Sequence, residues 1–224
     1  MSDEVCVLDH GIVRLVDWMG NDLSIVRNAR VSYDAEWRAG EDSGSDKRLI
    51  KYLWKNGHTS PFESCSVTFE IKAPIFVLRQ WMRHRTQSYN EVSARYRELP
   101  LEFYLPDEGS ITTQSTDNKQ MRTDEVHKNA KELRDLMRMC NEGSLAVYHK
   151  LIEEGCPREL ARSVMPVSTY SHMFATANLL NWMKFLKERL HPSSQYEIRV
   201  YAEVIEAFLR TLYPTAMEAF NGSN

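Results

Sequence analysis

One short segment of the chain, residues 79–97, concentrates side chains that bind anions. It contains five arginines and one acidic residue, Glu91, which gives it a local charge of +4 in a chain whose formal net charge is −3. The segment contains no lysine. A guanidinium group stays charged at any working pH and offers planar, paired donors that match phosphate oxygens. The composition therefore favours specific recognition of a phosphate group.

The spacing within this segment adds a second indication. Apolar residues at helical intervals predict a helix over residues 75–85, with Pro74 in its first turn. On that helix Arg79 and Arg83 share one face, and Gln80 lies three positions before Arg83. We expect residues 88–93 to form a loop, so that a nucleotide phosphate could lie between helix and loop. The alternative is an exposed basic helix with solvated charges, because short basic motifs often match by chance.

The order of residues in the segment is more specific than its charge. Arg83-His84-Arg85 is followed after seven residues by Ser93, and the segment also contains Asn90-Glu91 and Arg95-Tyr96. This pattern resembles the signature of the flavin-dependent thymidylate synthases. The resemblance spans residues 11–220, and its further matches are His58-Thr59-Ser60-Pro61-Phe62-Glu63, Lys72-Ala73-Pro74-Ile75-Phe76-Val77, Arg79-Gln80-Trp81, Cys156-Pro157-Arg158-Glu159-Leu160-Ala161-Arg162, Pro166, Asn178, Arg189 and Gln195-Tyr196-Glu197-Ile198-Arg199.

The resemblance implies an enzyme that converts dUMP to dTMP. In such an enzyme 5,10-methylenetetrahydrofolate supplies the one-carbon unit, NADPH reduces FAD, and reduced FAD supplies the hydride that completes the methyl group. FAD is then the cofactor, and dUMP, the folate and NADPH are the small-molecule partners. The resemblance also implies a homotetramer whose active sites are shared between subunits.

The matched motifs imply which residues form the site. For dUMP they are Gln80, Arg83, Glu91, Val92, Ser93, Ala94, Arg95, Arg162 and Arg189, with Arg95 and Arg162 supplying charge to the phosphate. For FAD they are His58, Ser60, Arg83, His84, Arg85, Glu91, Asn178 and Lys184. Arg189 is implied to be the catalytic residue, which stabilises the N3-deprotonated uracil ring and makes C5 enamine-like. Without the family context, Arg189 would be interpreted as a solvated surface residue.

The chain departs from the family pattern at three positions near the implied flavin site. Leu180 stands where many relatives carry Arg, and Lys184 and Ser193 stand where they carry Asn and His. Lys184 could reach a flavin phosphate or remain a solvated lysine. Two other functions stay open: methylation of UMP or another pyrimidine nucleotide, and a non-enzymatic module that binds RNA or nucleotides through its arginines, with strong salt dependence.

No residue shows the pattern of an activated nucleophile or a metal ligand. The four cysteines, Cys6, Cys65, Cys140 and Cys156, include no CxxC pair and no neighbouring histidine pattern, which argues against a disulfide framework and a structural zinc site. None of the cysteines carries a local activating pattern. Ser93 has no histidine base at a neighbouring position. We therefore expect no metal and no obligatory covalent bond between enzyme and uracil.

Composition describes an ordinary globular chain. Its 224 residues are 42% hydrophobic and 26% charged, which suits one domain over residues 1–224. No apolar run approaches the roughly 20 residues that cross a bilayer, and the small net charge does not favour bulk attraction to nucleic acid or membrane. The start Met1-Ser2-Asp3-Glu4 is acidic, unlike a secretory signal. We expect a cytoplasmic protein with no nucleic-acid or membrane partner.

The remaining patterns predict an α+β fold: a small, mostly antiparallel sheet early in the chain, packed with long helices from the second half. Strands are expected within residues 5–18, around a turn at His10-Gly11, and over residues 65–72, where apolar and polar residues alternate. Helices are expected over residues 21–33, 46–54, 75–85, 123–154 (kinked or broken at Gly143), 157–165, 168–190 and 194–213. Residues 36–46 and 111–121 are expected to be surface loops, the second one mobile.

Overall fold

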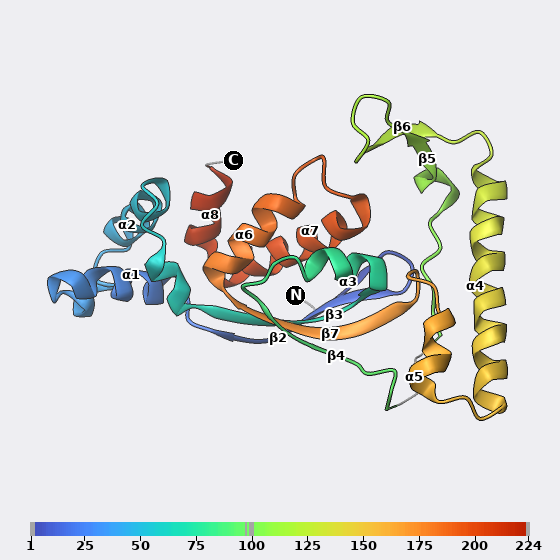
Figure 1. Ribbon diagram of the computed structural model, residues 1–224. Helices are drawn as coiled ribbons and strands as arrows, with labels where there is room; N and C mark the ends of the chain where they lie inside the picture. Colours follow the sequence, from blue (N-terminus) through green and yellow to red (C-terminus); the bar gives the residue numbers. More distant parts are fainter. Residues whose placement is uncertain (1–2, 97, 99–100, 223–224) are drawn as a thin grey trace.

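The computed structural model describes residues 3–96, 98 and 101–222 (Figure 1). Arg97 of the basic segment lies outside the described residues. Five strands form an antiparallel sheet in the order β1, β2, β3, β7, β4. Their bounds are β1 (Glu4–Val7), β2 (Gly11–Met19), β3 (Ser66–Pro74), β7 (Tyr170–Asn178) and β4 (Ser88–Glu91). Helices pack on this sheet, so the predicted α+β class is confirmed.

Strand β3 lies at the centre of the sheet and follows the predicted alternation. Val67, Phe69 and Ile71 are buried on the face that the helices cover. On the other face, the hydroxyl of Thr68 lies 2.9 Å from that of Thr176 on β7. Successive side chains of a strand point to opposite faces, so the period-two pattern fixes which face is buried.

Three helices cover one face of the sheet: α3 (Ile75–Trp81), α6 (Leu179–Arg189) and α7 (Tyr196–Leu212) (Figure 1). Trp81 of α3 and Trp182 of α6 are both fully buried, and their rings meet edge to face with centroids 6.4 Å apart. Phe185 packs against both of these rings. Trp81 is thus a core residue that fixes α3 against α6.

Two N-terminal helices join the C-terminal helix α8 (Pro214–Asn221) at one end of the sheet (Figure 1). Helix α1 (Asp22–Arg30) begins with a capping box between Asn21 and Ser24. Helix α2 (Ser43–Lys55) begins at Asp42, whose side chain accepts hydrogen bonds from the backbone N–H groups of Gly44 and Ser45. These backbone contacts lower the pKa of Asp42.

The peripheral elements include α4 (Ala130–Glu153), a two-stranded hairpin of β5 (Thr112–Gln114) and β6 (Arg122–Val126), and the short helix α5 (Arg158–Ala161). Figure 1 shows α4 standing beside the sheet rather than over it. Short 3-10 helices occupy Val31–Tyr33, Glu36–Arg38, Ser60–Ser64, Glu108–Ser110 and Arg162–Val164. In the part of the chain that the structure describes, no helix is long and apolar enough to cross a membrane.

One predicted helix is wrong. Residues 168–190 were expected to be helical throughout, but Tyr170–Asn178 forms strand β7, and only Leu179–Arg189 is helical. The second half of the chain is therefore not purely helical. Strand β7 pairs with β3 on one side and β4 on the other, and this tertiary pairing, rather than local propensity, determines its conformation.

Smaller corrections concern the ends of elements. The helix expected over residues 75–85 ends at Trp81, so Arg83 follows the helix and does not share its face with Arg79. Residues 88–91 form strand β4 rather than a loop, and Thr112–Gln114 and Arg122–Val126 form a hairpin where a loop and the start of a helix were expected. Helix α2 begins at Ser43, inside the expected loop, because Asp42 caps it. Helix α4 is continuous through Gly143.

Candidate active site

A cavity of about 520 Å³ lies beside the basic segment. Arg79 of α3 and Arg162, directly after α5, both line it, and neither makes an ion pair among the described residues. Glu91, at the end of β4, contributes a carboxylate. The other lining residues are Ile75, Val92, Ala94, Glu159, Ser163, Met165, Val167 and Ser171. Two unpaired guanidinium groups in a cavity of this size suit a small phosphorylated ligand.

The loop after β4 forms one wall of this cavity. Val92 and Ala94 line it, and between them the Ser93 hydroxyl accepts a hydrogen bond from the backbone N–H of Arg95 at 3.3 Å. Arg95 Nη2 lies 3.4 Å from the carboxylate of Glu159, and both side chains are more than half exposed. An exposed pair of this kind is weak, so a phosphate could displace Glu159 as the partner of Arg95.

Strand β7 fixes the position of Glu91. The buried hydroxyl of Ser171 donates a hydrogen bond to Glu91 Oε1. The backbone N–H of Val92 donates to the carbonyl of His172 at 2.8 Å, which ties the start of the loop to the same strand. The sequence did not predict a role for Ser171, because the strand that carries it was expected to be a helix.

A second cluster joins the end of α3 to the end of α6. Arg189 Nε donates to His84 Nε2 at 2.9 Å, and Arg189 Nη2 donates to the backbone carbonyl of Gln80 at 3.3 Å. The Arg189 side chain is 18% exposed, so it is not a solvated surface residue. A guanidinium group has five N–H donors, and these contacts leave the remaining donors for a ligand.

Charge and burial set the protonation of this cluster. Burial, followed by the nearby Arg189 guanidinium, lowers the pKa of His84, while Glu188 acts weakly in the opposite direction. Burial also lowers the pKa of Arg189, and Glu188 opposes that shift. At neutral pH His84 is therefore an uncharged imidazole, which is what a hydrogen-bond acceptor for Arg189 must be.

The residues predicted to contact FAD lie mainly near one end of the sheet. Asn178 ends β7 opposite Ser66 of β3, and Ser88, which follows the Arg83-His84-Arg85 loop, pairs with Thr176. Ser60 is in the 3-10 helix that leads into β3, and His58 precedes it, stacked on Tyr52 at a centroid distance of 6.1 Å. Arg83 and Arg85 are exposed and make no ion pair within the described chain. The three other residues predicted to contact FAD lie elsewhere: Glu91 lines the cavity, His84 contacts Arg189, and Lys184 lies on α6.

Positions where the chain departs from the family pattern have different environments. Leu180 is 4% exposed and packs in the core, so it presents nothing to a ligand. Lys184 is exposed, and its Nζ lies 3.4 Å from Asn181 Oδ1. The backbone N–H of Asn181 in turn donates to Asn178, which places Lys184 one step from a predicted flavin contact. The hydroxyl of Ser193 forms a hydrogen bond with the His191 ring, with 2.6 Å between Oγ and Nδ1.

Within one chain, the residues predicted to bind the nucleotide thus lie in two separate groups. Glu91, Val92, Ala94 and Arg162 line the cavity, with Ser93 and Arg95 in its adjoining loop. Gln80 and Arg189 lie together at His84, outside the residues that line the cavity. Arg83 follows α3 and faces solvent.

Sequence reasoning also assigned no site role to several residues that line the cavity. Arg79 was expected on the helix face beside which a phosphate could lie, but the matched motifs did not assign it to the site, and nothing indicated Ser163 or Met165. Arg79 was detectable, because it lies in the same basic segment. The others come from segments far away along the chain.

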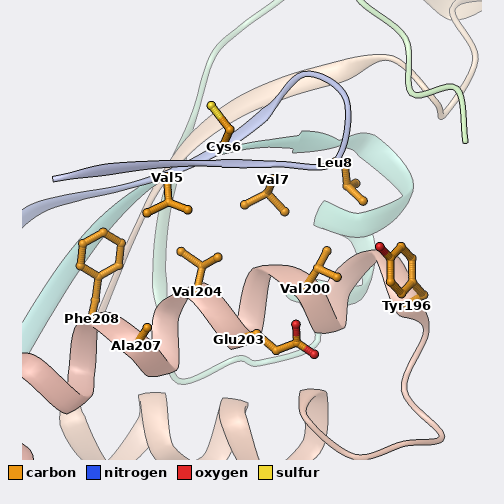
Figure 2. Close-up of a pocket in the computed structure, with 10 residues that line it drawn as sticks. All are labelled: Val5, Cys6, Val7, Leu8, Tyr196, Val200, Glu203, Val204, Ala207 and Phe208. Atoms are coloured by element: carbon orange, nitrogen blue, oxygen red, sulfur yellow. The ribbon is translucent and has the colours of Figure 1, made fainter. Parts of the chain in front are cut away.

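Another cavity, of about 380 Å³, lies between β1 and α7 (Figure 2). Its walls are mostly aliphatic and aromatic side chains, including Val5, Val204 and Phe208, and Glu203 is the one charged residue among those that line it. It has no cation for a phosphate, and none of the predicted site residues lines it. The arginine-lined cavity is therefore the better candidate for a nucleotide.

Comparison with known proteins agrees with this geometry. Residues 14–215 match the model of the family described as thymidylate synthase complementing protein. The chain belongs to this family. The match contains the basic segment, the cavity and the Arg189 cluster.

Two curated relatives of this family member share one name. The flavin-dependent thymidylate synthase of Anaplasma marginale is 44% identical over 221 residues, which cover 98% of this chain and 75% of the relative. The flavin-dependent thymidylate synthase of Wolbachia pipientis wMel is 43% identical over 223 residues, which cover 98% of this chain and 77% of the relative. The sequence-based resemblance to flavin-dependent thymidylate synthases is thus confirmed.

A solved structure extends the likeness to the fold. The UMP/dUMP methylase PolB from Streptomyces cacaoi, bound with 5-Br dUMP, is 37% identical, with a TM-score of 0.87 over 97% of each chain. The same enzyme bound with 5-Br UMP gives a TM-score of 0.84 over 99% of this chain and 95% of that one.

Proposed function

We propose that this family member is a flavin-dependent thymidylate synthase that methylates dUMP to dTMP. The observation that carries the proposal is the cavity in which Arg79, Arg162 and Glu91 meet beside the signature loop. Methylenetetrahydrofolate is the one-carbon donor and NADPH the source of electrons. The chain's own part of the chemistry is to bind the nucleotide, orient its ring and control charge at N3.

The phosphate of dUMP binds at the arginine side of the cavity. Arg162 lines the cavity directly, and Arg95 is held at its rim by a weak pair with Glu159. Glu91, fixed by Ser171, can accept hydrogen bonds from the sugar. Ser93 and the backbone of Val92 and Ala94 complete the wall. In this proposal, Gln80 and Arg83 are the remaining contacts to the nucleotide.

Arg189 is the proposed catalytic residue. Its guanidinium group is held by His84 and by the Gln80 carbonyl, so its remaining donors have a fixed direction. A fixed positive charge at the uracil edge favours loss of the N3 proton and places electron density at C5. This orientation needs no reorganisation when the charge develops, which is why a preoriented donor is effective.

The residues near the end of the sheet fit FAD by their chemistry. Arg83 and Arg85 are exposed guanidinium groups without ion pairs among the described residues, which suits a pyrophosphate. Asn178 uses its side-chain oxygen to cap α6 and keeps its amide N–H groups for a ligand. Ser60 and His58 would border the group, and exposed Lys184 would face a phosphate. When bound, FAD supplies the redox chemistry that completes the methyl group.

A second substrate is favoured by a specific observation. The solved structures with TM-scores of 0.87 and 0.84 belong to a protein described as a UMP/dUMP methylase. UMP differs from dUMP only by the 2′-hydroxyl group, so the same cavity and the same mechanism would serve both. Turnover of dUMP and UMP under identical conditions separates the two substrates.

We propose a homotetramer with shared active sites, working in the cytoplasm. Helix α4 supports the assembly, because Leu136, Met137, Met139 and Val147 are 44–64% exposed along it. The separation of Arg189 from the residues that line the cavity also supports it, since a neighbouring subunit can bring the two groups together. Light scattering after gel filtration measures the number of subunits.

The proposed function is tested with the purified protein. A yellow protein with a flavin absorption spectrum, or a colourless one that becomes yellow with FAD, is expected. With dUMP, methylenetetrahydrofolate and NADPH it should form dTMP, measured by chromatography. A protein that cannot be reconstituted with FAD, or that forms no methylated nucleotide, would contradict the proposal.

A further inference from the structure

A chain of polar side chains connects Gln80 to a buried carboxylate. The side-chain amide of Gln80 donates to Gln195 Oε1, and Gln195 Nε2 donates to Glu197 Oε2 at 2.8 Å. Glu197 is 4% exposed and lies in the first turn of α7. Gln195 and Glu197 belong to the matched Gln195-Tyr196-Glu197-Ile198-Arg199 motif.

Two further donors hold the Glu197 carboxylate. Tyr104 Oη donates to Glu197 Oε1 at 3.1 Å, and Arg122 Nη1 donates to the same oxygen at 3.2 Å. Burial raises the pKa of Tyr104, and the Glu197 charge raises it further, so the phenol stays protonated and remains a donor. A buried carboxylate that pairs with Arg122 and accepts three hydrogen bonds is an anion with a fixed position.

The charge of Glu197 determines how both amides are turned. An ionised carboxylate only accepts hydrogen bonds, so Gln195 must present its NH₂ group to Glu197 and its oxygen to Gln80. Gln80 must then present its own NH₂ group to Gln195. Its side-chain oxygen Oε1 accepts no hydrogen bond from the residues that the structure describes, so it is available to a ligand. Without the charge, either amide could rotate by half a turn at little cost, and Gln80 would lose its defined polarity.

The Gln80 backbone is fixed by the other cluster. Its carbonyl accepts the hydrogen bond from Arg189 at 3.3 Å, so one residue connects the catalytic arginine to the Glu197 chain. Arg122 lies on β6, which brings the β5–β6 hairpin into the same network. The network therefore holds Gln80 from two sides.

We propose that Glu197 is a positioning residue that makes Gln80 present a hydrogen-bond acceptor to the nucleotide. The proposal rests on the proposed function, in which Gln80 contacts dUMP. The group that Gln80 recognises is an O–H or N–H donor, which in dUMP means the sugar hydroxyl or the ring N3–H. Glu197 itself does not touch the nucleotide and acts through Gln195.

The test uses the FAD-loaded protein and measures dUMP affinity by calorimetry, without turnover. Glu197→Gln removes the charge but keeps the size, and it should weaken dUMP binding by about tenfold, the effect of about one hydrogen bond. Glu197→Asp keeps the charge and should recover part of the affinity. Glu203→Gln removes an exposed carboxylate from the same helix and should leave affinity within about twofold of wild type.

A double-mutant cycle distinguishes positioning from general damage to the fold. If Glu197 acts through Gln80, Glu197→Gln should change affinity by less than about twofold in a Gln80→Ala background. A tenfold loss that persists in that background would overturn the proposal. Unchanged affinity in folded Glu197→Gln would overturn it as well.

If Glu197→Gln does not fold, Gln195→Leu replaces it. That change removes the exposed link and leaves the Glu197 pair with Arg122 intact, so it should reproduce the tenfold loss. Wild-type affinity in this variant would overturn the proposal. Failure of wild-type protein to bind dUMP would instead contradict the proposed function.

Two nucleotide analogues identify the donor. 2′,3′-Dideoxyuridine monophosphate lacks the sugar hydroxyls, and N3-methyl-dUMP lacks the ring N–H. One of the two analogues lacks the donor that Gln80 recognises. Wild type should bind that analogue about tenfold more weakly than dUMP, and Glu197→Gln should not weaken its binding further. Both analogues remaining fully sensitive to the substitution would overturn the assignment of an acceptor to Gln80.

Discussion

Arg189 donates a hydrogen bond from Nε to the uncharged ring of His84, with 2.9 Å between the two nitrogen atoms. Both side chains would be cations if His84 were protonated. The contact therefore depends on the lowered pKa of His84, which burial causes first and Arg189 second. This relationship links the signature motif, which supplies His84, to the proposed catalytic residue more than 100 positions later in the chain.

We expect this contact to make activity sensitive to acid. The pKa of His84 lies below its usual value of about 6.5, so the ring is neutral at pH 7 and takes up a proton only as the pH falls below that value. Protonation removes the acceptor and places two positive charges together. The kcat/KM for dUMP should fall on the acidic side, and His84→Gln, which keeps an acceptor but does not titrate, should flatten this limb.

The matched control for that pH profile is His149→Gln on α4, because His149 is exposed. It should leave the profile unchanged. The free energy of unfolding should also fall as the pH falls. Below about pH 6.5 a histidine in the unfolded chain binds a proton, while His84 in the folded chain does not, so protonation favours the unfolded state. An acidic limb that survives in active His84→Gln would show that another group controls it.

Arg95→Ala should weaken dUMP binding by about 1.5 to 3 kcal/mol, the range for hydrogen bonds to a charged group. The side chain is exposed at the cavity rim and has only the weak pair with Glu159 to lose, so flavin content should be largely retained. Calorimetric titration with dUMP measures the change. Arg38→Ala is a close control, because Arg38 forms a similarly exposed pair with Glu41 at 3.5 Å. Equal affinities for dUMP in both variants would show that Arg95 does not contribute to dUMP binding.

The sequence predicted those parts of the fold whose pattern is local. Alternation identified β3, and Asn21 marked the start of α1. Strand β7 was missed because apolar Phe174 stands between apolar Met173 and Ala175, so the sequence does not alternate there. In the structure Met173 and Ala175 are buried, whereas Phe174 lies on the uncovered face and is 40% exposed. Its position between β3 and β4 depends on pairing with residues far away along the chain, which a local pattern does not encode.

The same distinction applies to the site. The spacing of the signature identified the segment from Arg83 to Arg95 without any knowledge of the fold. Ser171 could not be assigned, because its contact with Glu91 exists only once β7 is a strand. The chain from Gln80 through Gln195 to Glu197 joins residues 115 positions apart, so only the folded structure shows which amide faces which.

Asp46→Ala should destabilise the N-terminal helices. Asp46 is 4% exposed, with Oδ1 2.7 Å from Arg30 and Oδ2 accepting from the Gly40 backbone at 2.8 Å. Removing the carboxylate leaves a largely buried guanidinium unpaired, which costs about 3 kcal/mol or roughly 6 to 12 °C in Tm. Thermal melting measures it. Glu41→Ala, which breaks the exposed Arg38 pair, should change Tm by less than about 4 °C.

Mixing two inactive variants tests whether active sites are shared. Arg189→Ala and Arg162→Ala should each lose most activity, since the first removes the catalytic donor and the second a cavity arginine. If one site draws these residues from different subunits, unfolding and refolding the two variants together should restore part of the wild-type activity. Each variant refolded alone is the control. Sites built within one chain would give no recovery beyond the sum of the separate variants.

No side chain should form an obligatory covalent bond with uracil. Burial raises the pKa of the Cys65 thiol, which keeps it protonated and unreactive, and none of the four cysteines lines the arginine cavity. The Ser93 hydroxyl accepts a hydrogen bond from the Arg95 backbone, and no histidine contacts it in the described structure. A serine without a base is a weak nucleophile at neutral pH.

We therefore expect Ser93→Ala, and separately a variant in which all four cysteines are replaced by serine or alanine, to form dTMP at a reduced but measurable rate. Chromatography of single-turnover reactions with pre-reduced FAD and methylenetetrahydrofolate measures the product. Complete loss of dTMP in a folded variant that still binds FAD and dUMP, together with a nucleotide adduct trapped on the wild-type side chain, would establish nucleophilic catalysis instead.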